Sequence, residues 1–404
     1  MDTITHGIAG ALIGKAIFRG EDMFALKPLN RARIVTWSMM LSAIFPDSDT
    51  LRDIFSHNEL LVITWHRSIT HSLLCLPIWA LALAALTRWF TRWRKWDAPS
   101  FAMLAGIYAA GILSHILLDL VTSFGTMIWS PLEWSRPAWD LIFIIDFTFT
   151  AILLLPQILA WVYADPAHIK RRALRMWLIF VPAPVLIAGI GRIVGAPISG
   201  LTILGAILLF TTLFLLPALL GWGSRIRHDT WNRAGFVTAI AYISLTMYAH
   251  RAALVRVEEF AELMHLEVES IGALPLPPSL WRWDGLIRTP RGVYELRMDL
   301  SDKPATAESL STNPGTVAPT EHRYYPDAFP NSYIEAAARL PEVQKVLWFA
   351  RFPVTRFHKE GSDAIVEISD LRFPQVRRDR PASFTYRVRL DQAGQLISQG
   401  WVRR

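Results

Sequence analysis

The chain has 404 residues, of which 52% are hydrophobic and only 19% are charged. Ordinary soluble domains have about a quarter of their residues charged, so this composition favours a membrane protein. The net charge of +7 does not indicate nucleic acid binding, because the basic residues lie in short loops between apolar runs and form no patch interleaved with aromatic residues. The single cysteine, Cys75, excludes an intrachain disulfide.

Apolar stretches dominate the first 250 residues, and a membrane span needs about 20 such residues. Membrane segments are predicted near residues 4–18, 33–46, 69–87, 100–121, 141–163, 174–192, 201–221 and 235–250. The first two are short, and each is either a full span or a re-entrant helix. We therefore expect residues 1–250 to form an all-α polytopic membrane domain of about eight helices.

The remainder of the chain, residues 251–404, is more polar and rich in proline. An amphipathic helix is predicted for Arg251–His265, and alternating apolar residues predict strands at Gly292–Leu300, Ala364–Phe373 and Ser383–Leu390. Ser301–Glu321 is rich in Ser, Thr, Pro and Ala, which predicts a mobile loop. This part is expected to be a smaller α+β extramembrane domain.

Orientation is predicted from lysine and arginine, which short cytoplasmic loops retain. Alternate loops, at residues 19–33, 88–95, 170–175 and 225–233, hold 15 of these residues. The intervening loops hold 4, namely Arg52, Arg67, Arg136 and Arg192. The first set is therefore predicted to be cytoplasmic, and the C-terminal domain is predicted to lie on the outer, periplasmic side of the inner membrane.

With this topology, the ionisable residues within or beside the apolar segments gather at the outer face. They are His6, Asp47, Asp49, His66, His71, His115, Asp119, Asp140 and Asp146. Charges at membrane depth are costly and usually face a partner or a water-filled cavity. His115 and Asp119 are four residues apart and share one face of a helix. An N-cap at Ser68 would allow His66 and His71 both to turn inward.

Imidazole and carboxylate groups together indicate a metal site. They are ligands of Zn, Mn and Fe, and the absence of thiolates argues against a structural zinc site. Four histidines and up to four aspartates exceed what one tetrahedral ion needs. Either two or more ions share these ligands, or one ion is bound and the remaining carboxylates support it and act as general base.

Five ordered motifs also carry a family resemblance: MDTITHGIAGALIG at 1–14, FPDSDT at 45–50, HRSITHSLL at 66–74, SHILLDLVTSFGT at 114–126 and WSPLEWSRPAWDLIFIIDF at 129–147. At these residues the chain resembles the YdjM-type family of membrane-bound metal-dependent hydrolases, mainly over residues 1–165. The resemblance implies one to three divalent ions, zinc or manganese, with metal ligands at His6, Asp47, Asp49, His66, His71, His115 and Asp119. A further acid is implied at Asp146. It also implies hydrolase activity, for which we expect Asp49, Asp119 and Asp146 to be catalytic.

The His-x-x-x-Asp arrangement is also similar to that of zinc-dependent phospholipase C and P1-type nucleases, which cleave phosphoesters. This second resemblance implies that Arg67 or Arg136 binds substrate phosphate. At the outer headgroup level, the substrate expected is a membrane lipid ester, and no nucleic acid partner is expected. The sequence leaves the oligomeric state open.

Two alternatives remain from the sequence. In a transporter, the same His and Asp residues would relay protons or bind a passing metal ion, although the segments at 174–192, 201–221 and 235–250 offer no acidic path to the cytoplasm. In a non-catalytic scaffold, the metal would only tie helices together. An open coordination position favours the enzyme, whereas a closed four-ligand site favours the scaffold.

Overall fold

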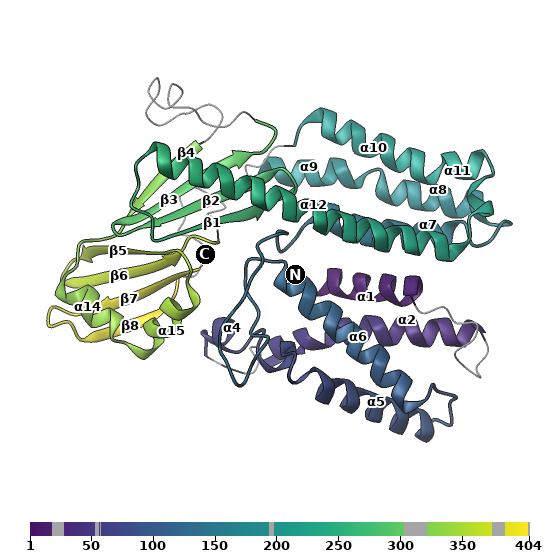
Figure 1. Cartoon of the computed structure of the whole chain (residues 1–404), viewed down its shortest axis with the longest axis horizontal. Helices are drawn as coiled ribbons and strands as arrows, with labels where there is room; N and C mark the ends of the chain where they lie inside the picture. The colour runs from purple at the N-terminus through teal and green to yellow at the C-terminus, as the bar shows by residue number, and fades with distance from the viewer. Residues whose placement is uncertain are drawn as a thin grey trace.

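The computed structural model describes residues 1–17, 28–52, 56, 58–193, 198–302, 321–373 and 384–402. Helices occupy the first part of the chain, and two sheets follow (Figure 1). The helices of the first part are α1 (Thr3–Ile17), α2 (Pro28–Ile44), α4 (Leu61–Thr64), α5 (Leu76–Trp93), α6 (Phe101–Leu120), α7 (Phe147–Val162), α8 (Ile169–Phe180), α9 (Ala183–Ile193), α10 (Gly200–Phe214), α11 (Leu216–Leu219) and α12 (His228–Leu263). Three short 3-10 turns, η1 (Phe45–Thr50), η2 (Ile69–His71) and η3 (Gly223–Arg225), join them.

Among the described residues, three helical stretches are long and apolar enough to cross a membrane: Phe101–Leu120, Ile169–Gly189 and Gly200–Leu219. A fourth is counted if Leu61–His71 and Leu76–Trp93, bent by 71°, form one broken span. The predicted domain of about eight membrane helices is therefore not confirmed. The segment predicted at 141–163 is shorter than expected, because its helix begins only at Phe147.

Close helix packing brings the site together, and two glycines permit it. A Cβ atom on Gly10 of α1 would lie 2.6 Å from the carbonyl oxygen of Met39 on α2. A Cβ atom on Gly111 of α6 would lie 1.9 Å from Ser42 Oγ, also on α2. Only glycine allows such close approach of two backbones. As a result, the ends of α1, α2 and α6 meet.

Helix α12 is one continuous element of 36 residues. The sequence predicts a membrane segment at 235–250 and a separate amphipathic helix at Arg251–His265, but the structure joins them. No glycine or proline interrupts residues 236–266, so nothing in the backbone ends the helix at residue 250. Its second half packs Ala253, Val257 and Phe260 against the first sheet.

The C-terminal region contains two four-stranded antiparallel sheets. The first has the order β1 (Ser270–Leu276), β2 (Arg282–Thr289), β3 (Gly292–Asp299) and β4 (Glu321–Pro326), and the second β5 (Pro353–Glu360), β6 (Asp363–Asp370), β7 (Thr385–Leu390) and β8 (Leu396–Trp401). Helices α14 (Ser332–Ala338) and α15 (Pro341–Phe349) pack against the second sheet. Strands β3, β6 and β7 confirm the three predicted strands. Most of the predicted loop, residues 303–320, lies outside the described residues.

The sheets contact the loops at one end of the helical part. Phe124, which follows α6, packs into the same core as Phe349 of α15. Arg372 donates a hydrogen bond from Nη1 to the carbonyl oxygen of Ser123 at 3.1 Å. Arg351 pairs with Asp140 at 2.9 Å. The second sheet is therefore attached directly to the helix ends that carry the candidate site.

Candidate metal centre

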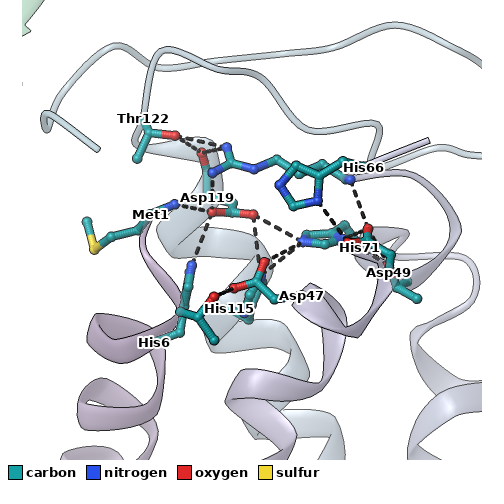
Figure 2. Close-up of polar contacts among 12 residues, drawn as sticks. Met1, His6, Asp47, Asp49, His66, His71, His115, Asp119 and Thr122 are labelled. Carbon is teal, nitrogen blue, oxygen red and sulfur yellow. Dashed lines mark hydrogen bonds and ion pairs between the residues drawn. The ribbon is translucent and has the colours of Figure 1, made fainter. Parts of the chain in front are cut away.

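Four of the predicted ligands, all buried, form one compact group. Ligand atoms of Asp47, His71, His115 and Asp119 lie within 4.8 Å of one another (Figure 2). Asp47 lies in η1 just after α2, His71 in η2, and His115 and Asp119 in the last turns of α6. The four-residue spacing on α6 and the close contact of α2 with α6 bring them together.

The distances within this group suit a shared cation. His71 Nε2 and His115 Nε2 are 3.0 Å apart. Asp119 Oδ2 lies 3.3 Å from His71 Nε2 and 3.4 Å from His115 Nε2. Asp47 Oδ1 lies 3.4 Å from His115 Nε2. These separations are close to those between ligands of one ion bound at about 2.0–2.2 Å.

Hydrogen bonds on the far side of each ring determine which nitrogen carries the proton. His115 Nδ1 lies 2.6 Å from the carbonyl oxygen of Ala43, which can only accept, so Nδ1 holds the proton. His71 Nδ1 lies 3.0 Å from Thr70 Oγ1, whose own proton goes to Asp49 Oδ2, so this Nδ1 also donates. Both Nε2 atoms then present lone pairs to each other and to two carboxylates, which requires a cation or a further proton between them.

The two carboxylate oxygens of Asp119 have different surroundings. Oδ1 pairs with Arg67 Nη2 at 2.9 Å, faces His6 Nε2 at 3.2 Å and accepts from the Met1 α-ammonium group. Oδ2 is buried and has no hydrogen-bond partner among the described residues. A buried carboxylate oxygen without a donor is costly unless a cation faces it. The four residues therefore fit a divalent metal ion.

His6 lies beside this group and not within it. Its Nε2 faces Asp119 Oδ1, and its ring stacks on that of His115 with 3.6 Å between centroids. Its Nδ1 is buried without a hydrogen-bond partner in the described structure. The predicted ligand His6 thus contacts two members of the group without adding a ligand atom to it.

Asp49 and His66, also predicted ligands, organise the loop that carries His71. Asp49 Oδ1 lies 2.8 Å from His66 Nδ1, and its Oδ2 accepts from Arg67 N at 3.0 Å. Ser68 is the N-cap residue of η2, as predicted, but its side chain makes no capping hydrogen bond. Asp49 closes this turn in its place.

Asp146 lies elsewhere, although it is predicted as a catalytic acid. Its Oδ1 caps α7 by accepting from the backbone N–H groups of Thr148 and Phe149. Its Oδ2 accepts from Tyr242 OH at 2.9 Å and from Ser279 N at 3.2 Å. This carboxylate joins α7, α12 and the loop between β1 and β2. Its contacts give no support to the predicted catalytic role.

The two arginines predicted to bind phosphate are occupied within the protein. Arg67 binds Asp119 and donates from Nη1 to Thr122 Oγ1 at 3.0 Å. Arg136 donates to three backbone carbonyls, including that of Gly125 at 3.1 Å, and both guanidinium groups lie 5.0 Å from the ring of Phe124. Their contacts indicate positioning of loops and of Asp119, not capture of a substrate phosphate.

Several contributors were not identified from the sequence. Met1, Thr3 and Thr70 contact Asp119, Asp47 and Asp49, respectively. Thr3 lies three residues before His6 in the first motif, and Thr70 lies directly before His71 in the third motif. These hydroxyls orient carboxylates, a task that residue type alone does not reveal.

Residues 1–193 match the family model described as YdjM inner membrane protein. No curated protein and no solved structure matches the chain. All seven predicted ligands fall inside the family match, whereas helices α10, α11 and α12 and both sheets lie beyond it. Residues 1–193, a little under half of the chain, are therefore similar to the YdjM inner membrane protein family.

Proposed function

We propose that this protein is a multi-pass, metal-dependent hydrolase of the inner membrane that cleaves an ester bond in a membrane lipid, most simply a phosphoester. The observation that carries the proposal is the unpartnered Asp119 Oδ2 facing two imidazole lone pairs. This donor set lacks thiolates and suits an exchangeable zinc or manganese ion. The family name supports the membrane location.

Asp47, His71, His115 and Asp119 would hold the ion. When bound, such an ion acts as a Lewis acid toward an ester and activates water near neutral pH. The chain's own residues prepare the ligands: Asp49 and Thr70 hold the His71 ring with Nε2 inward. Arg67 and Met1 hold Asp119 Oδ1, which leaves Oδ2 turned toward the two imidazole rings.

The proposed orientation places the centre at the outer face and the sheets in the periplasm. It rests on the 15-to-4 distribution of basic residues in the loops. The centre lies at the helix ends that face the two sheets (Figure 1). A reaction at this level would reach lipid headgroups.

One observation favours a second candidate, a metal that only ties helices together. The group offers four ligand atoms, the number that a structural tetrahedral site uses. Against this candidate, two ligands are carboxylates, and Asp47 borders a cavity. The hydrolase and the scaffold would both contain a metal ion, but only the hydrolase would turn over a lipid.

The test combines metal analysis with a lipid screen. Wild-type protein and the His115→Ala, Asp119→Asn and His168→Ala variants are purified, and each is assayed for metal and for hydrolysis of phospholipids and polyprenyl phosphates. His168 is a matched control because its side chain is 55% exposed and far from the centre in sequence. We expect metal and turnover in wild-type and His168→Ala protein and neither in the other variants. Metal without turnover on any lipid would favour the scaffold, and metal flux into liposomes without turnover would favour the transporter.

A further inference from the structure

A cavity of about 530 Å³ adjoins the metal centre. Its walls come from Leu41 at the end of α2, Phe45 in η1, Leu83 and Leu86 on α5, and Tyr108 on α6. Both α2 and α5 pack against α6, so α6 forms the floor between them. The volume falls within the range of cavities that hold small ligands.

Polar groups along this cavity are largely satisfied within the protein. Tyr108 OH and Thr87 Oγ1 bond to each other at 2.6 Å. Ser42 and Thr50 donate to backbone carbonyls of α2 and η1 at 2.8 and 2.7 Å. The remaining walls are mainly leucine, isoleucine and phenylalanine. An occupant of this space would therefore gain free energy from burying apolar surface and little from hydrogen bonds.

At one end, the cavity reaches a ligand of the metal centre. Asp47 lines the cavity, and its Oδ1 lies 3.4 Å from His115 Nε2. Thr3 Oγ1, also in the lining, donates to Asp47 Oδ2 at 2.5 Å. A molecule that fills the apolar part would thus place its polar end beside the group of four ligands.

The sides of the cavity carry exposed leucines. Leu41, Leu51 and Leu86 are 57%, 56% and 58% exposed. In the membrane orientation proposed above, these exposed leucines of α2, η1 and α5 would face lipid, so the cavity would open toward the bilayer. This opening determines the kind of occupant.

We propose that this cavity is a groove for one hydrocarbon chain of a membrane lipid, which enters sideways from the bilayer and presents its ester at Asp47. The inference rests on the proposed hydrolase function and adds the substrate class: a lipid recognised by its chain, in addition to its headgroup. The inference assigns binding of the lipid's hydrocarbon chain to apolar residues that have no part in holding the ion.

The test uses full-length protein in vesicles of phosphatidylethanolamine and phosphatidylglycerol, with a trace of phosphatidylglycerol that carries a diazirine on one acyl chain. After illumination, mass spectrometry maps the labelled residues with and without excess unlabelled lipid. We expect saturable labelling in the groove of wild-type protein, and its loss in Leu86→Trp and Leu41→Trp, whose larger side chains fill the opening. Leu81→Trp is the matched control, since Leu81 is also an exposed leucine of α5 but lies outside the lining.

Groove labelling that excess lipid does not reduce, or that persists in both groove variants, would overturn the proposal. The His115→Ala variant separates this inference from the hydrolase function. Saturable labelling in His115→Ala protein, with no turnover in any form of the protein, would support the groove and reject the hydrolase. Unchanged metal-dependent turnover in both groove variants would reject the groove and retain the hydrolase.

Discussion

His71 Nε2 lies 3.0 Å from His115 Nε2, while both Nδ1 atoms donate hydrogen bonds away from the pair. Two lone pairs at this distance repel each other unless a cation or a proton lies between them. If a metal ion binds there, it stabilises the folded state by mass action, by about 2.7 kcal/mol at a free concentration of 100 Kd. A chelator should therefore lower the Tm of wild-type protein, and zinc or manganese should restore it. An identical Tm with and without chelator would indicate a proton in place of the metal.

Asp49 should tune metal affinity without binding the ion. Asp49→Asn weakens the support of the His71 ring, and loss of such support costs about 10–100-fold in metal affinity. Competition with a chelator of known affinity measures this change. Asp165→Asn is the matched control, since Asp165 pairs with His168 on the exposed surface. Complete loss of metal in folded Asp49→Asn protein would make Asp49 a ligand after all.

Two glycines of α6 should respond in opposite ways to alanine. A Cβ atom on Gly111 would collide with Ser42 Oγ, so we expect Gly111→Ala to destabilise the protein by about 1–3 kcal/mol. Nothing lies within 4 Å of a Cβ atom built on Gly106, so Gly106→Ala should gain up to about 1 kcal/mol of helix propensity. Thermal unfolding in one detergent compares the two. Equal effects would show that α2 and α6 do not pack as closely as described.

Stability of the C-terminal region should depend on pH through Asp284 of β2. Burial and the neighbouring Glu295 carboxylate raise the pKa of Asp284 well above its usual value. The folded state then binds more protons than the unfolded state between the usual and the raised pKa, so stability falls as pH rises through that window. Asp284→Asn should raise the Tm at pH 7, with a smaller gain at pH 4.

Stability should depend on pH in the opposite direction through the partly buried Asp363 of β6. Its ion pair with Arg389 lowers its pKa, so its contribution is present above the usual carboxyl pKa and is lost as pH falls through the lowered value. Asp363→Asn should lower the Tm slightly at pH 7 and have no effect in strong acid.

For Asp284, the contradicting result is a lower Tm of the Asp284→Asn variant at pH 7. That result would mean that the Asp284 carboxylate stabilises the folded state.

Membrane orientation is tested by a reporter. Alkaline phosphatase fused after Arg404 should be active, because the distribution of basic residues among the loops predicts a periplasmic C-terminal region. A fluorescent protein at the same position should be dark if export precedes its folding. Bright fluorescence with inactive phosphatase would reverse the proposed orientation and remove the argument for outer headgroups.

The sequence predicted the convergence of the ligands because the positions of lysine and arginine, hydropathy and the spacing of His115 and Asp119 are local features. It did not separate the four grouped residues from His6 and Asp49, which differ in the direction of a single ring or carboxylate. The roles of Arg67 and Asp146 also depend on partners distant in sequence, Asp119 and Ser279. Such pairings arise from tertiary packing, which periodicity does not encode.

The continuity of α12 limits how a substrate can approach. Its 36 residues extend about 54 Å at 1.5 Å per residue, well beyond the roughly 30 Å hydrocarbon layer. Helix α12 has no break within this length. Separately, the contact of Phe124 with Phe349 packs the second sheet against the loops that carry the centre. A lipid substrate of the kind proposed would therefore reach the centre from the side, in the plane of the membrane.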